Sequence, residues 1–486
     1  MGKLTPKLPS VKSAVERETK YSVGAGFHLP PLKGSRLPAK SLISVYYDTS
    51  DLRLARARIT LRHRTQGRKS AWQLKLPLDC GRREVEMRGK PTIPPPQMLD
   101  LLFIHLQEGT VQPIATLRTR RTGVRVGGSK GVDVVLDEVA VLKQSSEVLV
   151  FREVEIERLD DDAALVNRLE KTLRKAGAAE HDGRPKVFRA LDLPLPGQME
   201  PPHSGDPADA HLRYILSRQL DTILSRDPGV RLGGDREDVH QMRVATRRLR
   251  SVLRAARPLL NPQWEASLRD ELKWLGRQLG EARDLDVQMA YFKGQTDEVK
   301  PPDRAAFKRF FDYLQQKRSK VQQQLVSRLR RPRYVALINQ LIPAVGEPAM
   351  VPHDVTLPDL ARKAFRKLRK EVKELDNSAS NAKWHCVRIQ AKRARYAAEL
   401  SEWCSGRVAT RFIDTIKLIQ DQLGEIQDAV MSEEHLRQFT SKKAGKHSVL
   451  LAGQMVERQR QRRRQAKQAF RSTWKEVKKC GKVAWC

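Results

Sequence analysis

The sequence HQMRVATRRLR at residues 240–250 recurs as HCVRIQAKRAR at residues 385–395, which lies 145 positions later. A second pair of matching segments follows at nearly the same offset, LGEARD at 279–284 and LGEIQD at 423–428. Two motifs displaced by almost the same distance indicate an internal duplication of one helical unit. We therefore expect two similar helical bundles related by a pseudo-twofold axis.

The repeated segment carries cations and apolar residues on opposite sides of a helix. At about 100° per residue, His240, Arg243 and Arg247 share one sector. Met242 and Leu249 lie on the opposite side and are expected to pack. Guanidinium groups match phosphate oxygens, so a row of them at helical pitch can follow a chain of phosphates. The corresponding residues of the two copies are His240, Arg243, Arg247, Arg250, His385, Arg388, Lys392 and Arg395.

Two other interpretations of this stripe stay open. Rows of Lys and Arg are often solvated surface, although a solvated face needs no histidine at the same place in both copies. The histidines could also be metal ligands, although neither has a His or a carboxylate at i+4. We expect Asp284 and Asp428 to hold basic side chains by ion pairing.

The repeated motifs resemble those of the CHAD domain, the conserved histidine α-helical domain, over about residues 209–480. The resemblance implies two four-helix bundles, about 209–342 and 358–480, with a basic pocket that binds inorganic polyphosphate. It implies that the eight stripe residues named above bind this polymer.

A Pro-rich stretch, 193–208, separates the helical part from a segment of different pattern. Before it, short segments alternate apolar and polar residues and are broken by Gly, Pro and Asp, which is typical of antiparallel strands. Glu16, Glu18 and Lys20 alternate along one predicted strand and share a face, and residues 153–157 place three glutamates on a face of another. The chain therefore predicts a strand domain before a helical one.

Charged residues on one strand face are costly in an apolar core, so this face is turned to solvent or to a liganded lumen. An outward polar face explains any single strand. Carboxylates on one strand and cations on others favour a lumen that holds metal and phosphate side by side. Hydrolysis of a triphosphate needs surrounding cations and a divalent metal to polarise phosphorus and activate water. Oxygen ligands suit Mg²⁺ or Mn²⁺.

The strand motifs resemble the CYTH domain, the triphosphate tunnel metalloenzymes, over about residues 13–192. They include E-x-E-x-K at 16–20, L-R-x-R at 61–64, W-x-L-K-L-P at 72–77 and E-x-E-x-E at 153–157. The resemblance implies a closed antiparallel β tunnel. The metal ligands it implies are Glu16, Glu18, Glu155 and Glu157. The catalytic residues it implies are Glu16, Glu18 and Lys20, and the triphosphate-binding residues are Lys20, Arg62, Arg64, Lys75, Arg121 and Lys186. Arg118 and Arg120 offer the opposite register to Arg121, and Asp137 is a further candidate for the lumen.

The 486-residue chain has a formal net charge of +35, from 92 Lys and Arg against 57 Asp and Glu. The excess is +11 in residues 1–200 and +24 in residues 201–486. Such a charge indicates a polyanionic partner: nucleic acid, a membrane, an acidic protein or condensed phosphate. Only 6% of the residues are aromatic, and no helix-turn-helix or zinc-finger spacing occurs, which argues against nucleic acid.

The remaining sequence features exclude several classes. No run of eighteen apolar residues and no leader occur, so we expect a cytoplasmic protein without membrane association. Association with polyphosphate granules is a further expectation. The five scattered cysteines predict neither a zinc site nor disulfides. The absence of a Walker loop argues against a P-loop NTPase.

We therefore predict a two-domain α+β protein, with an N-terminal antiparallel β tunnel (13–192) and a C-terminal all-α pair of pseudo-twofold four-helix bundles (209–480). The predicted function is hydrolysis of inorganic triphosphate, or a related short triphosphate, with Mg²⁺ or Mn²⁺, and polyphosphate binding by the helical part. The first alternative is a non-enzymatic polyphosphate-binding protein with an attenuated tunnel. Further alternatives are a class IV-type adenylate cyclase, a thiamine triphosphatase and a nucleic-acid binder.

Overall fold

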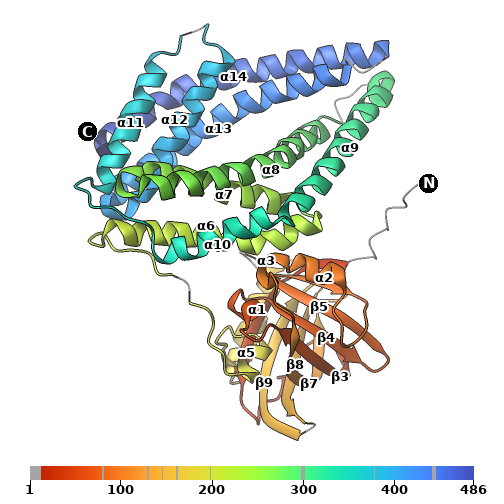
Figure 1. The fold of residues 1–486 in the computed structure, drawn as a ribbon. Coiled ribbons are helices and arrows are strands. Elements are labelled where there is room, and N and C mark those ends of the chain that lie inside the picture. The colour runs from red at the N-terminus through yellow and green to blue at the C-terminus, as the bar shows by residue number, and fades with distance from the viewer. Residues whose placement is uncertain are drawn as a thin grey trace. The chain divides into compact units, whose positions relative to one another are not determined.

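The computed structural model describes residues 12–78, 81–128, 131–144, 146–159, 162–197, 199–296, 301–376, 378–440 and 445–485. The chain divides into two compact units after residue 198, which falls inside the predicted linker 193–208 (Figure 1). Cys386, Cys404 and Cys480 are free thiols, and Cys80 and Cys486 lie outside the described residues.

The first unit is built on a ten-stranded antiparallel sheet with the order β1-β6-β5-β4-β3-β7-β8-β9-β2-β10. The strands are β1 (Lys12–Glu16), β2 (Glu18–Val23), β3 (Ser35–Asp48), β4 (Thr60–Gln66), β5 (Lys69–Pro77), β6 (Arg82–Met87), β7 (Gln112–Val126), β8 (Val132–Lys143), β9 (Ser146–Arg158) and β10 (Ala179–Glu180). The predicted antiparallel strand domain is confirmed.

The first predicted strand is in fact two strands, divided at Arg17. β1 pairs with β6 near one end of the strand order, whereas β2 pairs with β9 near the other. Because only Arg17 separates β1 from β2, the chain itself joins the two ends of the order and the sheet curls round on itself. This closure gives the sheet an inner and an outer face.

The outer face of the sheet carries its apolar core. On β9, Val154 and Ile156 are fully buried beneath the amphipathic helix α4 (Ala163–Lys175), together with Val134 of β8. The intervening residues of β9 are the glutamates of 153–157, which face the inside. The other short helices of this unit are α1 (Arg53–Arg56), α2 (Pro96–Leu101), α3 (Phe103–Leu106) and α5 (Lys186–Ala190). Strand alternation therefore places apolar side chains on the outer face of the sheet, where they pack against α4, and charged side chains on the inner face.

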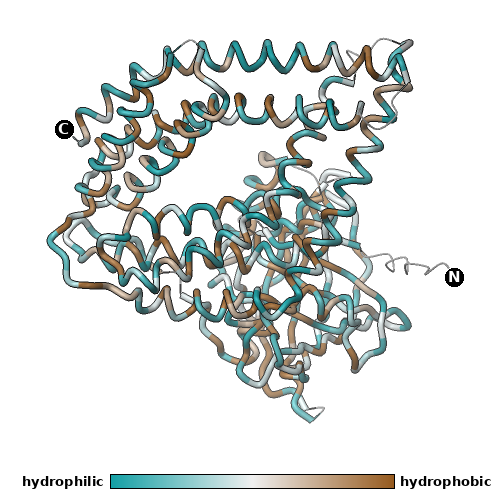
Figure 2. Tube along the Cα trace, turned by 45° about the horizontal axis from the view of Figure 1, so that its top comes forward, coloured by the Kyte–Doolittle hydropathy of each residue, from teal (hydrophilic) through white to brown (hydrophobic). Residues whose placement is uncertain are grey.

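The second unit is all-helical (Figure 1). Its helices are α6 (Ala208–Leu232), α7 (Arg236–Ala256), α8 (Pro262–Gly294), α9 (Arg304–Leu329), α10 (Pro332–Gly346), α11 (Leu357–Lys373), α12 (Asn381–Leu400), α13 (Glu402–Thr440) and α14 (Lys446–Trp485). Apolar and polar positions alternate along these helices, as expected of amphipathic segments (Figure 2). Gly406, with φ of 60°, interrupts α13 near its start.

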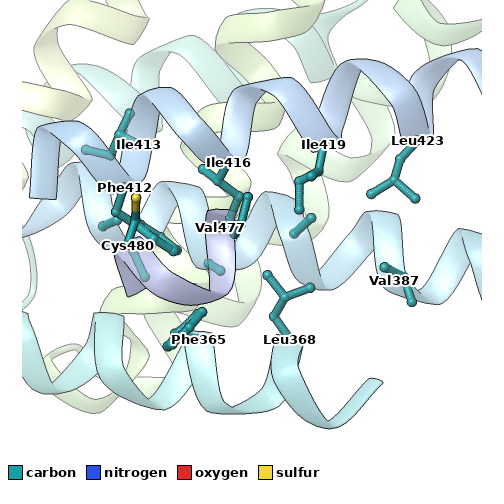
Figure 3. Close-up of a cluster of buried hydrophobic side chains, with 14 of the residues drawn as sticks. Phe365, Leu368, Val387, Phe412, Ile413, Ile416, Ile419, Leu423, Val477 and Cys480 are labelled. Atoms are coloured by element: carbon teal, nitrogen blue, oxygen red, sulfur yellow. The ribbon is translucent and has the colours of Figure 1, made fainter. Parts of the chain in front are cut away.

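The four helices α11 to α14 share one apolar core (Figure 3). Phe365 and Leu368 of α11 meet Phe412 and Ile416 of α13, and Val477 of α14 completes the contact. Side chains of this kind stabilise a helix pair by leaving water, at about 25 cal/mol per Å². The second half of the duplication is therefore a packed four-helix unit.

The two halves of the duplication also contact each other. The end of α8 and the start of α9 pack with the end of α13 and the start of α14, where Phe292, Phe310, Leu436 and Met455 are buried together. α7 contacts α12, so the two copies of the repeated segment lie next to each other. The halves therefore contact each other both at these helix ends and where α7 meets α12. Within the described residues, no helix has the length and apolarity to cross a bilayer.

Candidate functional site

A cavity of about 630 Å³ lies in the strand unit and is lined by charged side chains. All ten residues predicted to bind metal or triphosphate line it, whereas the further candidate Asp137 is not among the lining residues. They are Glu16, Glu18, Lys20, Arg62, Arg64, Lys75, Arg121, Glu155, Glu157 and Lys186. The structure therefore brings together residues that lie up to 170 positions apart in the chain.

Three half-buried carboxylates meet at the cavity. An oxygen atom of each of Glu16, Glu18 and Glu157 lies within 4.8 Å of the others. Strand register explains the meeting, because Glu18 of β2 is directly paired with Glu157 of β9 and Glu16 ends β1 just before. Burial raises the pKa of Glu157. Three crowded oxygen donors favour a cation between them.

A second group of carboxylates lies deeper and is fully buried. Asp137 has no exposed surface, and Glu153 and Glu155 lie beside it. The Nζ atom of Lys186 lies 2.9 Å from Asp137 Oδ2, 2.7 Å from Glu153 Oε1 and 2.8 Å from Glu155 Oε1. Lys20 Nζ is also 2.5 Å from Glu155 Oε1. This group is an ion-pair network rather than an open ligand set.

The network fixes the charges of its members. Burial alone would raise the pKa of Glu155, but Lys186, Lys20 and Arg121 hold the pKa well below its ordinary value. Burial alone would lower the pKa of Lys20, but the charges of Glu155, Glu18 and Glu153 raise it well above its ordinary value. Glu155 therefore lies among the basic side chains of Lys186, Lys20 and Arg121 and is not part of the trio of Glu16, Glu18 and Glu157.

Arg121 connects the two groups of carboxylates. Its guanidinium donates to both oxygens of Asp137 at 2.7 Å and to Glu157 Oε1 at 2.5 Å. Arg118 instead contacts Glu147, and both of these side chains are more than 40% exposed. Arg120 is exposed as well. The register that places Arg121 in the lumen is the one that the structure shows.

The lining also contains buried cations that lie outside the network of Lys20, Lys186 and Arg121. Arg62 donates to Gln73 Oε1 and to the Tyr46 hydroxyl, each at 3.0 Å. Arg64 Nε is buried without a hydrogen-bond partner among the described residues. Burial and the charge of Arg62 lower the pKa of Arg64 to about 10. Burial also lowers the pKa of Arg82. An anion placed here would compensate the cost of keeping these cations buried.

Several lining residues were not predicted from the sequence, notably Tyr46, Arg82 and Glu84. Arg82 and Glu84 alternate along β6, and Glu84 is the strand partner of Lys75. The same alternation that identified the other strands could have found them. Tyr46 sits in the apolar-looking end of β3, where no charge pattern marks the inward face.

The carboxylate trio suits a hard divalent cation. Carboxylate oxygens are the ligands that Mg²⁺ and Mn²⁺ take, and strands hold Glu16, Glu18 and Glu157 in fixed register. Each has a cation nearby: Lys75 contacts Glu16, and Lys20 Nζ lies 3.1 Å from Glu18. The donor set therefore fits a divalent metal and does not distinguish Mg²⁺ from Mn²⁺.

The helical unit gathers cations where α7 contacts α12. The positive charges that act most on Lys392 are those of Arg388 and Arg395 on its own helix and of Arg243 and Arg247 on α7. Burial and these charges lower the pKa of Lys392 to about 6. Burial likewise lowers the pKa of Arg388. We call Arg243, Arg247, Arg388, Lys392 and Arg395 the facing cluster. The facing cluster combines residues from both copies of the repeat.

The other predicted stripe residues lie around this cluster in different settings. His240 is half-buried, and burial together with Arg283 and Arg247 lowers its pKa. His385 is exposed, with Nδ1 3.0 Å from Gln427 Oε1. Arg250 lies near Arg269 and Arg277 of α8, and burial lowers its pKa. Arg283 of α8 is a further cation near His240 and was not predicted from the repeat.

The two aspartates of the repeated LGE motif have different contacts. Arg243 Nη1 donates to Asp284 Oδ1 at 2.7 Å, as the expected ion pair requires. The pKa of Asp428 is raised by burial, although Arg388 and Arg462 favour its charge. Among the described residues, neither His240 nor His385 belongs to a group of three potential metal ligands.

Comparisons with known proteins agree with this division. The family model described as the CYTH domain matches residues 14–188, and the one described as the CHAD domain matches residues 214–437. The uncharacterized protein MT2285 of Mycobacterium tuberculosis (strain CDC 1551 / Oshkosh) is 29% identical over 464 residues, which cover 87% of this chain and 88% of that protein.

Two solved structures are similar to parts of the chain. The CHAD domain of the plant Ricinus communis is 23% identical with a TM-score of 0.47, covering 57% of this chain and 94% of its own. HpAC1 of Hippeastrum, described as having a dominant triphosphatase activity, is 19% identical with a TM-score of 0.26, covering 37% of this chain and 98% of its own.

The order of the two matched families is the order of the two structural units, strands first and helices second. The chain therefore carries a CYTH domain followed by a CHAD domain.

Proposed function

We propose that the CYTH domain hydrolyses inorganic triphosphate, or a related short triphosphate, with a divalent metal, and that the CHAD domain binds inorganic polyphosphate. The observation that carries the first part is that one cavity is lined both by a trio of carboxylates, Glu16, Glu18 and Glu157, and by buried cations such as Arg62 and Arg64. The carboxylates suit a divalent metal, and the cations suit the negative charges of a short phosphate chain.

The residues of the cavity would have two separate roles, phosphate binding and metal binding. Arg62, Arg64 and Arg82 would bind the phosphates through their guanidinium groups. Burial lowers the pKa of Arg64 and Arg82, so a bound anion would offset the cost of burying their charges. Glu16, Glu18 and Glu157 would hold the metal. When bound, a divalent cation supplies electrophilic polarisation of the phosphoryl group. Lys20 lies 3.1 Å from Glu18, where it orients that carboxylate.

The buried network would hold this arrangement in place. Lys186 and Arg121 connect β7, β8, β9 and α5 through Asp137 and Glu155. A fixed charge pattern stabilises the transferring phosphoryl group without rearrangement during the reaction. The role proposed for Glu155 is therefore positioning, through Lys20 and Lys186, and metal coordination is the role of the outer trio.

The test measures phosphate release from tripolyphosphate by the full chain with Mg²⁺ or Mn²⁺. Glu18→Gln should reduce kcat at least a hundredfold, since the trio loses a charged ligand. Glu180→Gln is the matched control, because Glu180 is exposed on β10, the neighbour of β2. Arg64→Ala should mainly raise KM, with Arg68→Ala in the exposed turn as its control. Tripolyphosphate that binds but is not hydrolysed would identify a non-catalytic tunnel.

The facing cluster supports polyphosphate binding. Arg243, Arg247, Arg388 and Lys392 bring basic side chains from two helices close together. Among these four, in the described part of the chain, only Arg243 forms an ion pair with a carboxylate, 2.7 Å from Asp284 Oδ1. Like charges that repel in the free protein are stabilised by a bound polyanion. A linear phosphate chain can contact both helices at once.

Binding is measured by anisotropy of a labelled long-chain polyphosphate at fixed salt. Arg247→Glu and Lys392→Glu should each reduce affinity at least tenfold, whereas Arg257→Glu, an exposed residue following α7, should change it less than threefold. Duplex DNA or RNA that competes better than polyphosphate at equal phosphate concentration would contradict this part of the proposal.

A further inference from the structure

A pocket of about 580 Å³ lies in the helical unit between α11, α12 and α14. None of the eight predicted stripe residues lines it. Trp384, which does line it, directly precedes His385, and neighbouring positions on a helix point about 100° apart. The pocket and the stripe therefore use different faces of α12.

The rim of the pocket is uniformly basic. On α11, Arg366, Arg369, Lys370 and Lys373 follow the spacing i, i+3, i+4, i+7, so they share one face. Arg471 and Lys478 face them from α14, and no acidic residue lines the pocket. Glu374, which follows α11, is paired with Lys383 at 2.6 Å. Several positive charges converge here without a carboxylate among the lining residues.

The floor of the pocket is aromatic. Trp384 and Phe470 are at most 2% exposed and meet edge to face, with centroids 5.2 Å apart. The ring planes of Phe470 and Trp474 are nearly parallel, at 7°, with centroids 6.3 Å apart. Trp474 is only half-buried. A planar group that enters beside Trp474 would extend a stack that already exists.

One polar atom of this floor has no partner. The indole Nε1 of Trp384 is buried and makes no hydrogen bond among the described residues. A buried indole N–H ordinarily has an acceptor. Lys467 lies over the Trp384 ring, with Nζ 5.2 Å from the centroid. The floor thus combines aromatic faces with an unused donor.

The aromatic rings of the floor and the cations of the rim together indicate which kind of ligand fits the pocket. Inorganic phosphate chains would use the cations and leave the aromatic floor uncovered. An apolar ligand would make no use of the six cations of the rim. The volume of about 580 Å³ lies within the usual range for small-molecule sites, about 300 to 1,000 Å³. A molecule with one planar ring and several phosphates satisfies both parts of the pocket.

We propose that this pocket binds a nucleoside di- or triphosphate. The base lies beside Trp474, and the phosphates lie along the row of Arg366, Arg369 and Lys373 on α11. This site is additional to the triphosphate cavity of the CYTH domain and to the facing cluster. Its ligand is distinguished from polyphosphate by the base.

The test is photolabelling of the full chain with 8-azido-ATP, in EDTA to prevent turnover and with excess tripolyphosphate to occupy sites that need phosphate alone. Peptide mapping should locate the label on α14 around Trp474. Arg471→Glu should reduce this label at least tenfold. Lys475→Glu, an exposed residue of the same helix outside the lining, should change it less than twofold.

Trp474→Ala and Trp474→Phe separate recognition of the ring from charge. The alanine variant should lose the label at least tenfold and the phenylalanine variant should retain most of it, with an unchanged thermal unfolding curve as the check on folding. Equal loss in Lys475→Glu, label confined to residues outside this pocket, or equal protection by ATP and by further tripolyphosphate would overturn the proposal. Single-stranded RNA that protects better than ATP at equal phosphate concentration would overturn it too.

Discussion

Polyphosphate binding by the CHAD domain should become weaker as pH rises, because of Lys392. Burial and the charges of Arg388, Arg247, Arg243 and Arg395 lower its pKa to about 6 in the free protein. A bound polyanion favours the protonated amine, so binding takes up a proton whenever the free protein has lost it. Affinity therefore falls as pH rises above about 6.

The magnitude follows from the fraction of Lys392 that carries the proton. With a pKa of about 6, roughly half is protonated at pH 6 and roughly 1% at pH 8. If the bound form is protonated throughout this interval, the association constant falls by about fiftyfold, which is close to tenfold per pH unit at the upper end. His240 also faces the cluster, but its lowered pKa leaves it neutral over most of this interval.

The assay is anisotropy of labelled long-chain polyphosphate between pH 6 and 8.5 at constant ionic strength. Lys392→Arg is the matched control, because a guanidinium stays charged in this range and should give an almost flat profile. Lys392→Met should also give a flat profile, at the low affinity of the wild type at high pH. A steep profile retained in Lys392→Arg, or a flat profile in the wild type, would refute the reasoning.

Three further predictions concern stability. Arg121→Ala should cost about 3 to 5 kcal/mol in unfolding free energy, because it removes one of the cations that neutralise the buried Asp137 and Glu155. Arg120→Ala on the exposed face should stay within about 0.5 kcal/mol, and urea unfolding measures both. Lys392→Met should raise the melting temperature by a few degrees without polyphosphate, since it removes an amine that the folded protein must either keep charged beside other cations or deprotonate. An unchanged or lower value would contradict this. Gly481→Val should lower the melting temperature of the helical unit, because even a Cβ atom there would lie 2.3 Å from the Phe365 ring, and the expected cost is about 1 to 3 kcal/mol.

The strand domain shows which features local patterns can predict. Alternation correctly assigns the inner faces of β4, β5 and β9, because each strand alone determines which side chains share a face. It does not show that the first strand divides at Arg17, since that depends on the different partners of β1 and β2. Alternation also gives the side of a residue but not its depth. Glu155 and Glu157 share a face, yet only Glu157 lies with Glu16 and Glu18.

The helical domain shows a similar limit. The repeat predicts the cations of α7 and α12, but their meeting in the facing cluster depends on the contact between these helices. The basic run at residues 362–370 is indistinguishable from solvated surface until α14 places Phe470 and Trp474 beside it. A contact between segments about a hundred residues apart has no local signal.

Metal-dependent hydrolysis in the strand cavity is the central claim, and release of phosphate from tripolyphosphate by the full chain tests it most directly. We predict release that requires Mg²⁺ or Mn²⁺, stops with EDTA, and is nearly abolished by Glu18→Ala while Glu180→Ala turns over normally. Unchanged turnover in Glu18→Ala, or turnover that continues in EDTA, would contradict the claim.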